Sequence, residues 1–442
     1  MKNSGSILNG FIKPLILVAF ISTLAACSST KKFNKNLGRD FSNSAVFNQS
    51  FSGFALMDPV NNEMLNEYNS QKYFTPASNV KLLTFYAGLK VLGDSLPALS
   101  YVIQNDSLIF KGTGDPSFLY ADAYRSKVYE FLKNREENLY YQRPVFNEES
   151  FGPGWSWDDY NYYYSVERAA FPIYGNYVEF NSEIGQDKPS TNIQQFEDSL
   201  IASKNDLDIE RDLDKNIFRY NNSKLKEGSS RIVPFKYSEE LFTKLLADTL
   251  NKPVKLIDEK WKITTSSKIF YSLPADSLYK TMLRNSDNFI AEQLLIMVGN
   301  NVSDSLSTKN AIKFMKSKYL NDLPDELIWV DGSGLSRYNL VTPRSMVVLL
   351  KKIMEEIPQE KLFDFLPTGG QNGTLKNWYK AEEPYIFAKT GTLSNNHNLS
   401  GYIKTKSGRI LLFSFMNNNY TVSSSIIKTE MQRILRNIYL NY

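Results

Sequence analysis

The chain of 442 residues has a single cysteine, Cys27, and a single histidine, His397. One cysteine cannot form a disulfide within the chain, and the two residues together cannot supply the several ligands of a zinc site. Any histidine–aspartate catalytic pair would have to use His397, which we interpret instead as a hydrogen-bonded residue of an asparagine-rich loop. We therefore expect no metal and no other cofactor.

The chain also lacks an excess of charge of one sign. It has 51 basic and 47 acidic residues, which gives a net charge of +4. This balance is too even for nucleic acid to be a leading partner, and we expect none. Hydrophobic residues make up 42% and charged residues 22% of the chain, as in a globular protein of two or three domains.

The apolar run near the N-terminus, residues 14–26, is too short to cross a bilayer as a helix. It ends in Leu24-Ala25-Ala26-Cys27, which resembles a bacterial lipobox. We predict a lipoprotein signal peptide over 1–26, lipidation of Cys27, and a polar tether over 27–44. An ordinary signal peptide with an accidental cysteine is the alternative. The prediction implies an exported protein, anchored to the membrane and facing the periplasm.

Three short motifs follow one another along the chain: S-x-x-K at Ser78–Lys81, S-D-N at Ser286–Asn288 and K-T-G at Lys389–Gly391. The last two occur once each. The first has little weight alone, because it recurs at Ser28, Ser29, Ser223, Ser277 and Ser425. Only at Ser78 does it open an apolar helical stretch ahead of both other motifs. This ordered set indicates acyl transfer through a serine ester, with lysine as the base.

The first motif suits a serine nucleophile. Ser78 and Lys81 are three residues apart and share one face of a helix, which brings the amine to the hydroxyl. A lysine acts as a base only when it is neutral, and burial or a second cation lowers its pKa. Lys389 is the natural second cation. We therefore predict Ser78 as nucleophile and Lys81 as general base.

The other two motifs suit proton relay and substrate binding. We expect Ser286 to pass a proton toward the leaving group and Asn288 to orient Lys81 and the substrate amide. We expect Lys389 and Thr390 to hold a terminal carboxylate, one by its charge and one by its hydroxyl.

Two further features of the third motif concern the backbone. Gly391 would let a substrate backbone lie close to its strand. The backbone N–H groups of Ser78 and Thr392 would form the oxyanion hole.

Hydrophobic periodicity predicts the elements that carry these motifs. Strand pairs are expected around residues 54–65 and 101–110, helices after 78 and on both sides of 286–288, strands over 385–390, 399–405 and 410–416, and a closing helix over 423–439. An aromatic-rich stretch over 139–180 is interpreted mainly as core packing, and less as a substrate groove.

Further segments accompany the motifs: Gly114-Asp115-Pro116, Val330-Asp331-Gly332-Ser333-Gly334-Leu335-Ser336, Phe365-Leu366-Pro367 and Asn372-Gly373-Thr374-Leu375. With them the chain resembles the low-molecular-mass class C penicillin-binding proteins of the penicillin-binding-protein-4 type. These are D-alanyl-D-alanine carboxypeptidases and endopeptidases. The resemblance implies peptidoglycan stem peptides as substrate and β-lactams as covalent inhibitors.

The same resemblance implies an α+β, penicillin-recognising fold, in which helices flank an antiparallel sheet that carries the active site at its edge. We assign residues 45–118 plus 263–442 to the catalytic domain and 119–262 to a β-rich inserted module. Two alternatives remain. One is a β-lactamase or esterase of the same fold, and the other is a non-catalytic lipoprotein that binds the cell wall.

Overall fold

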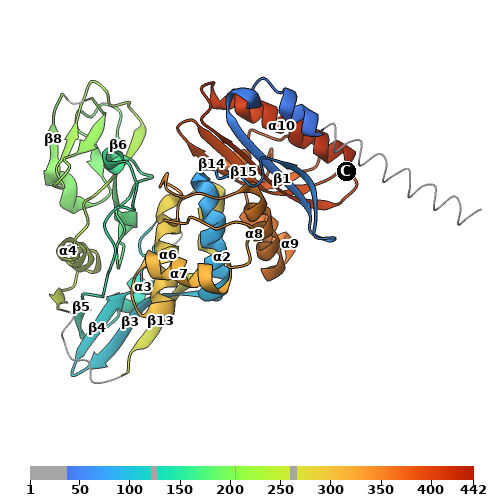
Figure 1. Cartoon of the computed structure of the whole chain (residues 1–442). Helices are drawn as coiled ribbons and strands as arrows, with labels where there is room; N and C mark the ends of the chain where they lie inside the picture. Colours follow the sequence, from blue (N-terminus) through green and yellow to red (C-terminus); the bar gives the residue numbers. More distant parts are fainter. Residues whose placement is uncertain (1–36, 121–126, 205, 259–265) are drawn as a thin grey trace, which may run out of the picture.

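The computed structural model describes residues 37–120, 127–204, 206–258 and 266–442. The predicted signal peptide, Cys27 and the first part of the predicted tether lie outside these residues. The described chain is elongated, with one five-stranded sheet at one end, helices in the middle, and further sheets beyond the helices (Figure 1). Within the described ranges, no helix is both long enough and apolar enough to cross a membrane.

The main sheet is antiparallel throughout and has the order β14-β15-β16-β1-β2. Its strands come from both ends of the described chain, and they confirm the strands predicted there. They are β1 (Phe51–Asp58), β2 (Glu63–Tyr68), β14 (Ile386–Leu393), β15 (Asn396–Lys404) and β16 (Ile410–Asn418). Pairing of β1 with β16 joins the two ends of the chain in one sheet, and β14 is left at the edge.

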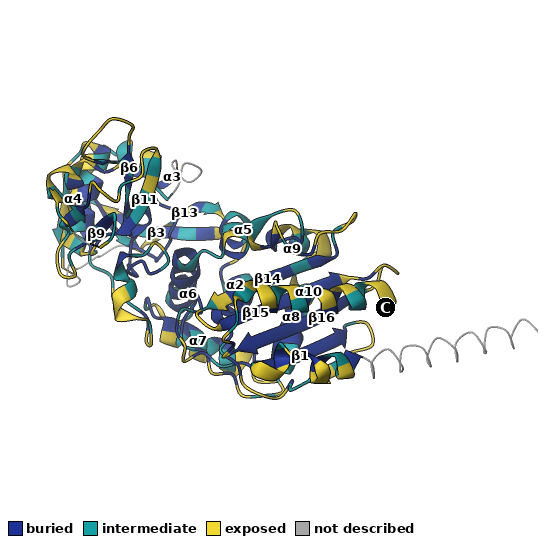
Figure 2. Ribbon diagram, turned by 90° about the horizontal axis from the view of Figure 1, so that it is seen from above, coloured by how far each residue is buried: buried dark blue, intermediate teal, exposed yellow. Residues whose placement is uncertain are grey.

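Helical segments cover both faces of the main sheet (Figures 1 and 2). Successive strand residues point to opposite faces. On β16, Phe413 and Phe415 therefore pack with α10 (Ser424–Asn441) and the helical residues 37–43, whereas Leu412 and Met416 pack with α8 (Pro343–Glu356). Helix α10 confirms the predicted closing helix.

A core of helices joins the main sheet to the rest of the molecule. It contains α2 (Lys81–Val91), α5 (Ala275–Asn285), α6 (Asn288–Ser303), α7 (Thr308–Lys318) and α9 (Gln359–Phe365). Every residue of α6 from Phe289 to Gly299 is buried, as expected of a helix that is apolar on most sides; Glu292 and Gln293 are the polar residues of this stretch. The predicted helices after residue 78 and on both sides of 286–288 are confirmed.

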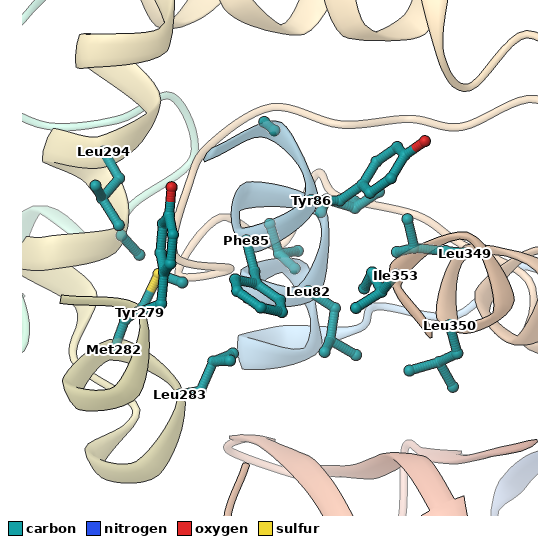
Figure 3. Packing of buried hydrophobic residues seen from close by; sticks show 14 of the residues in the cluster. Leu82, Phe85, Tyr86, Tyr279, Met282, Leu283, Leu294, Leu349, Leu350 and Ile353 are labelled. Carbon is teal, nitrogen blue, oxygen red and sulfur yellow. The ribbon is translucent and has the colours of Figure 1, made fainter. Parts of the chain in front are cut away.

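Helix α2 lies in the centre of this core. Figure 3 shows Phe85 between side chains of α5 and α6 on one side and of α8 on the other. Its ring meets that of Tyr279 edge to face, with centroids 5.2 Å apart. This packing fixes the beginning of α2, where Lys81 is the first residue.

A second five-stranded sheet has the order β12-β5-β4-β3-β13, in which β5 pairs in parallel with both β12 and β4. The strands are β3 (Ser95–Gln104), β4 (Ser107–Gly112), β5 (Asn138–Gln142), β12 (Val254–Ile257) and β13 (Lys268–Pro274). Strands on both sides of the expected module boundaries share this sheet. The division into a catalytic domain and an inserted module stays a prediction.

The remainder of the expected module forms two three-stranded sheets, β8-β10-β9 and β11-β6-β7. The strands are β6 (Tyr177–Ser182), β7 (Ser190–Thr191), β8 (Leu200–Ala202), β9 (Ile209–Arg211), β10 (Phe218–Tyr220) and β11 (Ser229–Pro234). Two helices, α3 (Lys127–Lys133) and α4 (Glu239–Leu250), were not predicted. In α4 the Ser238 side chain accepts from the Leu241 N–H, and this N-cap begins the helix.

Candidate active site

The predicted nucleophile lies in a short 3₁₀ turn, η2 (Ala77–Val80), which leads directly into α2. Lys81 Nζ donates a hydrogen bond to Ser78 Oγ at 2.9 Å. Ala77, just before the serine, has a left-handed backbone with φ of +49°, a conformation uncommon for a residue with a side chain. In this turn Ser78 is partly exposed, whereas Lys81 is fully buried.

Lys81 has hydrogen-bond partners from three separate parts of the chain. Besides Ser78 Oγ, its amine donates to Asn288 Oδ1 at 2.6 Å and to the Ser333 carbonyl oxygen at 2.8 Å. An ammonium group has three donors, and all three are used here. When neutral, the Lys81 amine has two N–H donors and one lone pair. In this arrangement the lone pair can accept the proton of the Ser78 hydroxyl.

The S-D-N motif makes the break between α5 and α6. Ser286 adopts a left-handed backbone with φ of +59° at the end of α5. Asp287 is the N-cap of α6 and accepts from the Ile290 N–H at 2.9 Å. The break turns Ser286 and Asn288 toward the nucleophile, and Asn288 Nδ2 donates to the Tyr164 carbonyl at 2.8 Å.

The K-T-G motif lies on the edge strand β14. Lys389 Nζ donates to Ser286 Oγ at 2.8 Å, which links the second and third motifs. Thr390 Oγ1 donates to Thr374 Oγ1 at 2.7 Å, so the segment around Thr374 also borders the site. Thr392 lies at the far end of the motif and lines the same cleft as Ser78.

Gly391 has a packing role that the sequence did not indicate. A Cβ at this position would clash with the Pro76 carbonyl and crowd Asn79. The missing side chain therefore lets η2 lie directly against β14. Asn79 Nδ2 closes this contact by donating to the Lys389 carbonyl at 3.0 Å.

Two buried lysines give the site its electrostatic character. Burial lowers the pKa of Lys81 to about 8, although Asp287, Asp331 and Glu292 oppose this shift. Burial, with a smaller contribution from Lys81, holds the pKa of Lys389 well below its ordinary value. Both amines thus lose their protons more easily than lysines in water.

Ser78, Ser286, Asn288, Thr390 and Thr392 line a cleft of about 1360 Å³. Its lining also includes aromatic residues, among them Trp155, Tyr164 and Tyr177. The aromatic-rich stretch therefore divides between two roles, because Tyr141 and Phe171 are buried in the core while others face the cleft. Core packing describes only part of that stretch.

Sequence reasoning missed several neighbours of Lys81. The Ser333 carbonyl and the buried acids Glu292 and Asp331 were given no role. The only signal was the conspicuous segment 330–336, which precedes the third motif. Arg168, buried beside Glu292, was missed as well.

The whole chain was compared with known proteins. A model of the D-Ala-D-Ala carboxypeptidase 3 (S13) family matches residues 34–438. The chain belongs to this family. D-alanyl-D-alanine carboxypeptidase DacB from Haemophilus influenzae is 26% identical over 442 aligned positions, which cover 88% of this chain and 90% of the relative.

Solved structures show the same fold. Penicillin binding protein 4 (dacB) from Haemophilus influenzae matches with a TM-score of 0.70 and 22% identity, over 92% of this chain and 98% of that one. A penicillin G acylated predatory endopeptidase from Bdellovibrio bacteriovorus, in complex with an immunity protein, matches with a TM-score of 0.50 and 15% identity, over 87% and 90%. The predicted family, penicillin-recognising fold and enzyme class are confirmed: the chain is an S13 hydrolase of the D-Ala-D-Ala peptidase class.

The single histidine of this S13 peptidase lies on β15 and not in a loop, which corrects the interpretation from sequence. Its Nδ1 is hydrogen-bonded to Thr392 Oγ1 at 2.8 Å. Burial, helped by the cations Lys428 and Lys389, lowers the pKa of His397 to about 3. The ring is therefore neutral at physiological pH.

We predict that the His397 ring does not titrate between about pH 8 and about pH 5 in the folded protein. Carbon-13 NMR of histidine-labelled protein measures this without assignment, because the chain has one histidine. Urea-unfolded protein is the control and should titrate near the ordinary value of about 6.5. The depressed pKa also means that His397 stabilises the fold above about pH 6.5, and that this contribution is lost as the pH falls toward about 3. A folded-state midpoint near about 6.5 would contradict the buried, neutral ring.

Proposed function

We propose that this peptidase cleaves after D-alanine in peptidoglycan stem peptides through an acyl-enzyme on Ser78. The observation that carries the proposal is the fully buried Lys81 amine, 2.9 Å from Ser78 Oγ in a cleft that also holds Ser286, Asn288 and Thr390. A hydroxyl needs a base to become a nucleophile, and a lysine with a pKa of about 8 can serve as one.

In the first half of the reaction, one proton moves from Ser78 to the leaving group. Neutral Lys81 takes the Ser78 proton as Oγ attacks the carbonyl carbon of the penultimate D-alanine. The backbone N–H groups of Ser78 and Thr392 stabilise the oxyanion. The proton then passes from Lys81 through Ser286 to the leaving nitrogen, and the C–N bond breaks. Lys81, neutral again, activates water to hydrolyse the ester.

The terminal carboxylate is assigned to Lys389 and Thr390. Burial lowers the pKa of Lys389, and a bound carboxylate favours the charged amine. Substrate binding would therefore favour the protonated form of Lys389. The resulting second cation near Lys81 would in turn favour the neutral base.

The proposal includes carboxypeptidase and endopeptidase activity, since the relatives carry both descriptions. The two reactions differ only in the leaving amine, which is free D-alanine or a neighbouring stem. Chromatography with mass spectrometry of the products from a purified pentapeptide muropeptide and a purified cross-linked dimer separates them. The first reaction releases D-alanine, and the second converts dimer to monomers.

We predict that Ser78→Ala abolishes both muropeptide cleavage and labelling by a fluorescent penicillin, because no other hydroxyl is hydrogen-bonded to Lys81 among the described residues. The matched control is Ser277→Ala, which changes another S-x-x-K serine outside the cleft and should keep both. Unchanged melting temperature would show that the fold survives. Label that persists in Ser78→Ala, or that maps to Ser286, would disprove the assignment.

A lipid anchor at Cys27 forms the second part of the proposal, supported by the lipobox-like Leu24-Ala25-Ala26-Cys27. It would hold a periplasmic enzyme at a membrane surface. Cys27→Ala should move the protein from the detergent phase to the aqueous phase in a phase-separation assay, or leave an uncleaved precursor. Ser28→Ala, one residue further along, should partition as wild type. Unchanged detergent partition of Cys27→Ala would rule the anchor out.

A further inference from the structure

The segment 330–336, conspicuous in the sequence, forms a loop wedged between α6 and the turn that carries the nucleophile. Gly334 has φ of +86°, and a Cβ there would clash with the Ala77 carbonyl. On the other side, Thr84 Oγ1 of α2 donates to the Gly332 carbonyl at 2.6 Å. The loop is therefore in close contact with the residues on both sides of Ser78.

The backbone of Ser333 connects this loop to the predicted base. Its carbonyl accepts from Lys81 Nζ at 2.8 Å, and its N–H donates to Glu292 Oε1 at 2.7 Å. The carboxylate on α6 and the amine on α2 thus hold the two peptide groups on either side of the Ser333 Cα. Ser333 and Lys81 have no exposed surface, so water cannot replace either contact without a rearrangement.

Asp331 keeps the loop in shape. Its Oδ1 accepts from the Gly334 N–H at 2.9 Å, and its Oδ2 accepts from the Ser336 N–H at 2.7 Å and from Trp155 Nε1 at 2.9 Å. Both oxygens of this carboxylate therefore have structural partners. They make the tight turn but do not touch Lys81.

Glu292 is different, because only one of its oxygens has a hydrogen bond. Oε2 is buried without a hydrogen-bond partner and lies 3.8 Å from Arg168 Nη1. The same Nη1 lies 2.9 Å from Glu148 Oε2. A neutral glutamine could accept from the Ser333 N–H equally well, and burying a charge is costly. The hydrogen bond to Ser333 alone therefore does not require a carboxylate here.

We propose that Glu292 is a positioning residue for Lys81: it holds the Ser333 backbone so that the amine points at Ser78, and its negative charge acts directly on that amine. This inference rests on the proposed acylation of Ser78. It assigns a role to segment 330–336, which presents a backbone carbonyl as the third partner of the base.

The charge effect has a definite sign. Burial raises the pKa of Glu292 to about 7, with Asp331 adding to the rise and Arg168 opposing it, so the group is a carboxylate at the pH where Lys81 titrates. A nearby carboxylate raises the pKa of a lysine. Loss of this charge should lower the pKa of Lys81 and shift the rise of acylation to lower pH. The charged groups that face the two residues are Asp287, Asp331, Lys389, Arg168 and Glu148.

The test is the pH profile of acylation by a chromogenic β-lactam, measured on the full chain. Glu292→Gln keeps an acceptor for the Ser333 N–H and removes the charge. We expect its midpoint to fall by on the order of half a pH unit or more, with a plateau rate close to wild type. Glu292→Asp keeps the charge and withdraws the acceptor. We expect its midpoint to stay, and its plateau rate to fall about tenfold or more.

The matched control is Asp115→Asn. Asp115 is also a fully buried carboxyl whose pKa is raised by burial, but it is not among the charges that act on Lys81, so both midpoint and plateau should stay. An unmoved midpoint in Glu292→Gln, or a wild-type plateau in Glu292→Asp, overturns the proposal. Either variant decides alone if the other fails to fold. Absence of acylation in the wild type would instead overturn the proposed function.

Discussion

The buried amine of Lys81 is the constraint on which the rest of the site depends. A charged ammonium in the protein interior is costly, and an isolated neutral amine would have no fixed direction. The fold meets both demands with three acceptors, from Ser78, Asn288 and Ser333, and with acids close enough to limit the loss of charge. The resulting pKa of about 8 is close to physiological pH. A base with such a pKa can both take and give up a proton.

Each acceptor belongs to a different element. The position of the amine therefore depends on how these elements pack together. The nucleophile turn is held against β14 because Gly391 has no side chain, and Asn288 is aimed by the break between α5 and α6. The loop around Ser333 packs against both the nucleophile turn and α6. A displacement of any one element would lengthen one hydrogen bond and change the balance at the others. The wall of apolar side chains around Phe85 keeps these elements together (Figure 3).

The region beyond the helices contributes to the site as well as to the shape of the molecule. Tyr164 accepts from Asn288, Trp155 donates to Asp331, and Arg168 faces Glu292. All three come from the stretch that was expected to be mainly core. The part of the cleft lining that this stretch supplies is therefore linked to the groups that surround the base. Substrate bound along that part would contact residues whose hydrogen bonds extend to Lys81.

Much of this could be predicted from the sequence, for identifiable reasons. Local periodicity indicated the helix after Ser78, the three last strands and α10, and short motifs indicated which side chains meet. Other features depend on tertiary contacts that no local pattern encodes. The Ser333 carbonyl is a backbone group, so its residue type carried no signal. In sequence, Glu292 is one of two adjacent polar residues, with Gln293, in an otherwise apolar stretch, and His397 lies on a strand although asparagines precede it.

The proposed chemistry requires that Lys81 can be neutral near physiological pH. The most direct measurement is a carbon-13 NMR titration of lysine Cε in the labelled protein, with Lys81→Arg used to identify the signal. The account predicts that the signal missing from the variant titrates with a midpoint of about 8. A midpoint for that signal near the ordinary lysine value of about 10.4 would contradict it.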